Sequence, residues 1–210
     1  MKDSIININR LKRHIFQIAI FISLTFICNS VSKAQLSFIA GGNYSNVRSN
    51  ISLENKGPIA GYNFGLSYQY YPFKGFRKIS ILNELVYNRK GYRQDFEKEY
   101  TSRFNYLSLP VLVNYSLSKD FAIQSGFEMS KLIATNIEQG LDTYNNFDVG
   151  LVFGISYLKS KRLSCYSRFT YGLLPMLDYY NIDELGNFKN EIHDVKNVCF
   201  SIGIKFILFE

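Results

Sequence analysis

The stretch Gly61-Tyr-Asn-Phe-Gly-Leu-Ser-Tyr-Gln-Tyr70 alternates between small or polar residues and large apolar ones. Aromatic and aliphatic side chains occupy the even positions, whereas glycine, asparagine, serine and glutamine occupy the odd ones. Successive side chains of a β-strand point to opposite faces, so the stretch predicts a strand with one apolar and one polar face. The same alternation returns in Leu107–Ser116, Asp148–Tyr157 and Val198–Phe206.

Eight stretches of this kind follow Gln35 and predict eight strands. They cover residues 36–46, 60–71, 78–90, 104–116, 121–132, 147–158, 162–173 and 196–208. The connections 72–77, 117–120 and 159–161 are short, whereas those near 47–59, 91–103, 133–146 and 174–195 are longer. Outer-membrane barrels have short periplasmic turns and long outer loops, so this rhythm predicts that both termini lie in the periplasm.

The polar face decides between a barrel in lipid and a soluble barrel. Its many glycines would weaken a solvated sheet, but in a narrow eight-stranded interior they make room for larger side chains opposite them. The glycines are Gly61, Gly65, Gly126, Gly150, Gly154, Gly172 and Gly203. The apolar face carries aromatics near strand ends, and Tyr70, Tyr71, Phe73 and Phe76 suggest an interfacial girdle. We expect an all-β, eight-stranded antiparallel up-and-down transmembrane barrel; a lipocalin-like soluble barrel is the alternative.

The first 34 residues are typical of a cleavable secretory signal peptide. A basic start is followed by the apolar run Ile15–Cys28 and by small residues at Ser32 and Ala34. We therefore expect a signal peptide over residues 1–34 and a barrel domain over 35–210. Five of the 24 basic residues and one of the 17 acidic residues precede Gln35, so the net charge falls from +7 to +3 on cleavage. No basic stripe remains that would indicate nucleic-acid binding.

Charged residues on the polar face are expected inside the barrel. They are Glu84, Lys90, Glu128, Asp148, Arg168 and Lys205. Buried charges need partners, so these residues predict a network along the barrel axis. Arg168 is expected at its centre, since its planar guanidinium can bind two carboxylates. We favour a plug of paired charges over an ion path, because an eight-stranded interior is normally filled by side chains.

The same parity places Cys165 on the outer face and Cys199 on the inner face, which predicts no disulfide. The segment after the seventh strand is unusually apolar and suggests an interaction surface, a fold over the barrel mouth or an extension of strands above the membrane. Its candidate contact residues are Leu174, Met176, Leu177, Tyr179 and Tyr180.

Signals for catalysis or metal binding are weak. His193 is the one histidine after Gln35, and the chain has no nucleophile elbow, metal-spaced histidine pair or phosphate-binding glycine loop. Acidic clusters occur in two expected outer loops, at Asp95, Glu97 and Glu99 and at Asp183 and Glu184. Solvated loops explain them better than calcium sites, which need converging oxygens. We therefore expect no catalytic residues, no metal and no cofactor.

Four segments resemble the PorT-like outer-membrane β-barrel family of Bacteroidota. They are Glu84–Gly91, Tyr106–Tyr115, Asp148–Gly154 and Arg168–Leu173. The chain departs from the family pattern at Ser108, where a glutamate is common, and at Glu210, which follows the usual final phenylalanine. The resemblance implies an outer-membrane barrel, and some members are similar to components of type IX secretion.

The residues and the resemblance together predict a non-enzymatic barrel of the bacterial outer membrane. Its expected role is structural, or that of an accessory subunit of an envelope or type IX-like secretion complex. The alternatives are a small diffusion pore and a lipid-modifying enzyme. Expected partners are outer-membrane lipid, lipopolysaccharide and other envelope proteins.

Overall fold

A computed structural model describes residues 34–49, 56–73, 75–95, 99–138, 144–158, 160, 162–182 and 188–209. Within these ranges the side chains of residues 178–193 are not described. The expected signal peptide therefore lies outside the described residues except for Ala34, while the first strand begins at Gln35.

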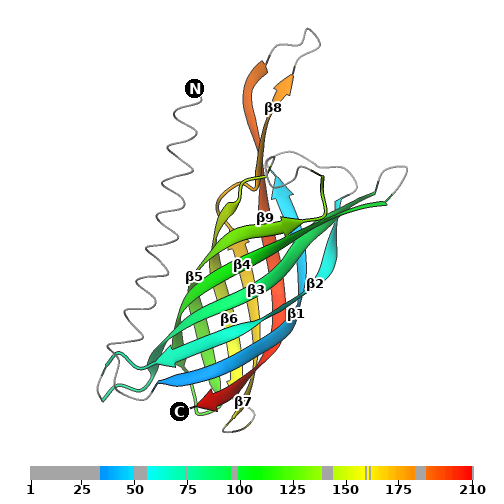
Figure 1. Cartoon of the computed structure of the whole chain (residues 1–210). Coiled ribbons are helices and arrows are strands. Elements are labelled where there is room, and N and C mark those ends of the chain that lie inside the picture. The colour runs from blue at the N-terminus through cyan, green and yellow to red at the C-terminus, as the bar shows by residue number, and fades with distance from the viewer. Residues whose placement is uncertain are drawn as a thin grey trace.

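The described residues form one antiparallel sheet that closes into a barrel (Figure 1). Its strands are β1 (Gln35–Ser49), β2 (Lys56–Tyr70), β3 (Ile79–Asp95), β4 (Glu99–Ser116), β5 (Phe121–Thr135), β6 (Phe147–Leu158), β7 (Leu163–Gly172), β8 (Leu177–Ile182) and β9 (Phe188–Phe209). Each strand from β1 to β7 pairs with the next, β7 pairs with β9, and β9 pairs with β1. The ring thus contains eight strands and confirms the predicted fold.

The two ends of the barrel differ. Leu36 pairs with Phe209, so β1 starts and β9 finishes at one end, which we call the terminal end. The connections 71–78, 117–120 and 159–162 also lie there, and the other end is the distal end. At the distal end the strands continue beyond their predicted limits, which leaves only 50–55 and 96–98 between the first two strand pairs. The expectation of long connections was wrong for these two, because strand pairing continues where apolar and polar residues no longer alternate, whereas the connection 136–146 between β5 and β6 remains long.

The last connection also contains paired strand. Leu177 pairs with Val195 and Tyr180 with Ile192, so β8 and the first part of β9 form a hairpin. Figure 1 shows this hairpin projecting beyond the rest of the barrel at the distal end. The extension of strands is therefore observed from Leu177 onward, and the packing of the residues at its base is described with the interior below.

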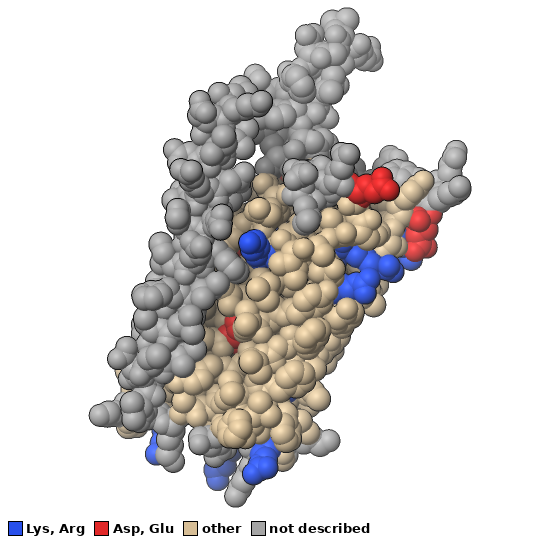
Figure 2. All heavy atoms as spheres, in the orientation of Figure 1, with Lys and Arg blue, Asp and Glu red and all other residues tan. Residues whose placement is uncertain are grey.

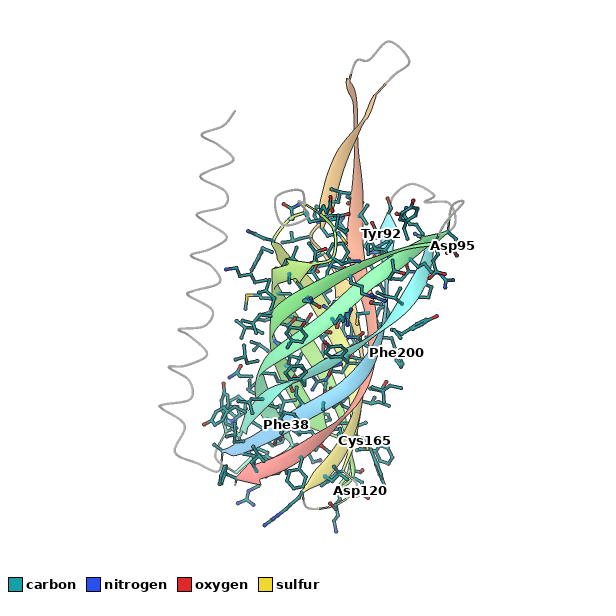
Figure 3. The ribbon with its side chains drawn as sticks, turned by 45° about the vertical axis from the view of Figure 1, so that its right-hand side comes forward. Phe38, Tyr92, Asp95, Asp120, Cys165 and Phe200 are labelled. Atoms are coloured by element: carbon teal, nitrogen blue, oxygen red, sulfur yellow. The ribbon has the colours of Figure 1, made fainter. Side chains whose placement is uncertain are left out.

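The outer wall is apolar. Phe153 is 52% exposed and Ile202 is 57% exposed, although both sit in the middle of paired strands. Figure 3 shows Phe200 at the outer edge of the barrel, Phe38 is 43% exposed, and the face in Figure 2 has few charged groups across its middle. A soluble barrel would bury this set, so the arrangement suits contact with lipid. Among the described residues no helix is long and apolar enough to cross a membrane.

The expected aromatic girdle is present only in part. Phe73 and Phe76 are exposed beside the β2–β3 turn, as a membrane-interface position requires. Tyr70 is buried, and the Tyr71 hydroxyl accepts a hydrogen bond from Gln69, an inward residue. The expectation was therefore wrong for Tyr71, whereas Tyr70 keeps the strand face of Phe64 and Leu66 and its ring contacts that of Tyr68.

Glycine makes room for a large side chain inside the barrel, as predicted. A Cβ atom on Gly203 would lie 2.4 Å from the hydroxyl of Tyr166, whose ring crosses the interior from β7. That hydroxyl donates a hydrogen bond of 2.8 Å to Asn63 on β2. The missing side chain at position 203 thus lets one phenol span the barrel.

Candidate functional site: the barrel interior

The inward side chains follow one another along each strand. On β3 they run from Ser80 at the terminal end through Glu84 and Lys90 to Tyr92 at the distal end. All four are at least nine-tenths buried. The interior therefore changes along its axis from hydroxyls and amides, through charges, to aromatic rings.

Arg168 and Glu84 form a clamp across the middle of the interior. The guanidinium donates two hydrogen bonds to the Glu84 carboxylate, Nη1 to Oε2 at 2.6 Å and Nη2 to Oε1 at 2.9 Å. Its Nε donates a third to Gln124 at 2.8 Å, and the Ser67 hydroxyl donates to Glu84 at 3.0 Å. Arg168 thus binds one carboxylate and one amide, so the expectation that it joins two carboxylates was wrong.

A second ion pair lies nearer the distal end. Lys90 Nζ donates to Glu128 Oε1 at 2.6 Å, and the two side chains are almost fully buried. Ser130 also donates to this carboxylate, at 3.1 Å, and shares a hydrogen bond with Ser108. The two ion pairs are separate contacts, and each carboxylate receives a serine hydroxyl as well as a cation.

The remaining two expected charges bind amides. Asp148 Oδ2 accepts a hydrogen bond of 2.8 Å from Asn197. Lys205 Nζ donates to Gln69 Oε1 at 2.8 Å. Asp148 lies at the distal end of β6, whereas Lys205 lies near the terminal end of β9, so these opposite charges are far apart along the barrel.

A chain of amides connects the clamp to Lys205. Gln124 Nε2 donates to Asn114, and Asn114 Nδ2 donates to Ser80, both at 3.2 Å. Gln69 Nε2 donates to the same serine at 3.0 Å while its oxygen accepts from Lys205. These side chains come from β2, β3, β4, β5 and β9, so they tie most of the wall together at this level.

An apolar cluster fills the distal mouth. Its buried members are Val47, Tyr92, Phe104, Tyr106, Leu132, Met176 and Val195. Met176 is only 1% exposed and Leu177 packs on the same cluster, so these residues fold over the mouth rather than offer a free surface. Leu174 packs against a second cluster formed by Leu109 and Phe147. The side chains of Tyr179 and Tyr180 lie outside the described part.

The other sequence candidates lie apart from this interior. Cys165 is partly exposed and Cys199 is buried, and both thiols are free; Figure 3 shows Cys165 on the outer side. Arg93 pairs with Asp95 at 3.2 Å and with Glu99 at 3.8 Å. Glu97, Asp183, Glu184 and the His193 side chain lie outside what is described, and the described residues contain no metal-binding group of His, Cys, Asp and Glu.

Several interior partners were not singled out from the sequence. Gln124, Asn197 and Tyr166 lie on the same strand faces as charges that we named, and Tyr106 lies on the inward face of β4. Strand parity would have found them, since each is an even number of residues from an inward position. Charge alone was too narrow a signal, because neutral amides and phenols also pair buried ions.

Comparison with known proteins agrees with this architecture. The profile described as outer membrane protein beta-barrel domain matches residues 29–178. The chain belongs to this family. The match runs from just before β1 into β8, so it includes most of the ring of this outer-membrane β-barrel. No curated protein matches the sequence.

Solved structures similar to this outer-membrane barrel have low sequence identity. Neisserial surface protein A is 12% identical with a TM-score of 0.50, and the match covers 83% of this chain and 99% of that one. Ail, the attachment invasion locus protein of Yersinia pestis, is 10% identical with a TM-score of 0.45 over 84% and 100%. OprG from Pseudomonas aeruginosa is 11% identical with a TM-score of 0.45 over 85% and 98%. The likeness to Neisserial surface protein A supports the fold alone.

Proposed function

We propose that this protein is a non-conducting, non-enzymatic barrel that acts through its surfaces, as a structural or accessory subunit in the outer membrane. The observation that carries the proposal is the Arg168–Glu84 clamp, which spans the interior from β7 to β3 with two short hydrogen bonds. A pore needs a continuous water path along the axis, and a buried ion pair across that axis opposes one.

Two further layers support a closed interior. The Lys90–Glu128 pair lies beyond the clamp, and the apolar cluster around Phe104 and Met176 fills the distal mouth. Between the layers, a hollow of about 20 Å³ lies beside Arg168 and Glu128, roughly the room for one water molecule. Arg168, Glu84, Lys90 and Glu128 pair with each other, and this use of four interior charges also argues against a lipid-modifying enzyme, which would need such groups at a substrate.

Planar-bilayer recordings test this proposal. We expect no steady current from the wild-type barrel. The double variant Glu84→Ala/Arg168→Ala, with Lys119→Gln on an exposed turn as its control, shows whether the clamp contributes to closure. Steady open-channel currents from the wild type would favour the diffusion pore and defeat the proposal.

We further propose that residues 1–34 direct export, that both termini are periplasmic and that the protein is a PorT-like member serving an envelope or type IX-like complex. The apolar run before Cys28 and the four resembling segments support this placement. Cross-linking in native membranes followed by affinity purification tests it. A reproducible envelope partner is expected, whereas a barrel that always purifies alone would count against an accessory role.

Lipopolysaccharide is the proposed lipid partner. Arg48, Arg89 and Lys131 lie on the outward faces near the distal ends of β1, β3 and β5. Arg48 stacks over the Tyr171 ring at 4.0 Å and Arg89 lies over Tyr62 at 5.6 Å, a pairing of cation and aromatic suited to a membrane interface. These cations are placed to meet lipid phosphates.

The three cations can be tested together. We expect the variant with glutamine at positions 48, 89 and 131 to retain several-fold less co-purifying lipopolysaccharide than the wild type. Lys119→Gln, at the terminal end, is the matched control and should retain the wild-type amount. Equal retention by the triple variant would contradict the lipid proposal.

A further inference from the structure

The terminal end of the interior opens into a pocket of about 340 Å³. Its lining includes Gln69, Asn114, Ser156, Ser164 and Lys205, which come from five different strands. This volume lies within the range of sites for small organic ligands, about 300–1,000 Å³. The inner part of the lining carries amides, hydroxyls and the Lys205 ammonium group, whereas Lys119 and Asp120 lie at its rim, so the pocket suits a polar ligand.

Lys205 supplies a positive charge without a carboxylate partner. Its Nζ donates to the neutral amide oxygen of Gln69 at 2.8 Å, and it takes part in none of the ion pairs of the described residues. Glu84 acts electrostatically on Lys205, but both oxygens of that carboxylate are held by Arg168. The charges of the clamp offset each other, which leaves the ammonium group uncompensated.

The rim of the pocket does not remove this charge. Lys119 and Asp120 lie on the exposed β4–β5 turn and offset each other, and Figure 3 shows Asp120 at this end of the barrel. Tyr71 and Phe121 add aromatic groups to the same lining. The inner part of the pocket is therefore positive, while its entrance is neutral overall and partly aromatic.

Neighbouring hydrogen bonds hold the amide groups in place. Gln69 and Asn114 both donate to Ser80, and Gln69 accepts from Lys205. Such prior ordering reduces the entropy lost when a ligand binds. Behind them the Arg168–Glu84 clamp closes the interior, so a ligand enters and leaves only through the terminal end.

We propose that this pocket binds the carboxylate of a small polar molecule, with the terminal carboxylate of a short peptide as the fitting class. Lys205 alone among the amides and hydroxyls of the inner lining matches a monoanion with peptide-like polar groups, whereas bidentate recognition of phosphate favours arginine. The ligand would come from the periplasm if the termini are periplasmic, as the proposed function has them; binding itself does not depend on that orientation.

Ligand-observed NMR titration of the mature barrel in detergent micelles tests the site. The probe is acetyl-alanyl-alanine, and its C-terminal amide is the matched control. We expect the acid to bind at least tenfold more tightly than the amide, since a charge-assisted hydrogen bond is lost in the amide. Equal binding of acid and amide would overturn the proposal. Succinate as a second probe distinguishes a free small acid from a peptide terminus.

Variants connect binding to this pocket. Lys205→Gln should weaken binding about tenfold to a hundredfold, whereas Lys56→Gln, at the distal end of β2 and outside the pocket, should leave it within about threefold. Ala122→Phe fills the pocket from β5 without touching the charge and should abolish binding. Heat-modifiable gel mobility verifies folding of each variant. Wild-type affinity in Ala122→Phe or in Lys205→Gln would refute the site. Because the titration uses micelles, its result does not depend on the orientation of the barrel in the membrane or on its conductance.

Discussion

Removing one partner of the central clamp should destabilise the barrel strongly. The Arg168 and Glu84 side chains are 8% and 0% exposed, and they share hydrogen bonds of 2.6 and 2.9 Å. Glu84→Leu leaves a buried guanidinium with no carboxylate partner, a change that costs about 3–5 kcal/mol. With a urea dependence of about 2 kcal/mol per molar, the unfolding midpoint should fall by about 2 M.

The double variant makes this prediction sharper. Glu84→Leu combined with Arg168→Met removes both charges, and a buried ion pair replaced by apolar groups is often nearly neutral. The double variant should therefore be more stable than either single variant, which gives a coupling energy of about 2 kcal/mol or more in a double-mutant cycle. The exposed pair Arg93–Glu99 is the control, and its loss should cost about 1 kcal/mol or less.

Urea unfolding of the barrel in phospholipid vesicles measures these differences. The chain contains no tryptophan, so far-ultraviolet circular dichroism and heat-modifiable gel mobility are the suitable signals. The reasoning is refuted if Glu84→Leu costs no more than the exposed control. It is also refuted if the double variant loses as much stability as the two single variants together.

Three other predictions concern the wall. Gly203→Val should prevent assembly, because its Cβ would collide with the phenol ring of Tyr166. Gly42→Val should assemble, because no atom lies closer than 3.9 Å to the added Cβ. The fraction of each variant with heat-modifiable gel mobility measures assembly. Ile202→Arg should cost about 2–4 kcal/mol in vesicle unfolding and Ile202→Leu about 1 kcal/mol or less; equal costs would argue against lipid contact. Mild oxidation should not join Cys165 to Cys199, and a mass two hydrogens lower in the intact monomer would contradict their opposite faces.

The sequence alone determined which residues form the outer wall of this protein. Residues such as Phe64, Phe153 and Ile202 repeat every second position, and this period places them on one face whatever the strands pair with. The number of barrel strands and the inward direction of Glu84 and Arg168 follow from the same local rule. Periodicity is a property of neighbours along the chain, so it can be recognised before the fold is known.

The tertiary structure decided which interior groups meet. Arg168 and Glu84 are 84 residues apart, and the closure and stagger of the ring give Arg168 a single carboxylate together with Gln124. The alternation of residues also could not predict the strand extensions at the distal end, the burial of Met176 or the lack of a carboxylate partner for Lys205. A two-residue period states which side a residue faces, whereas contacts across a barrel depend on strand register and tilt, which only the closed sheet defines.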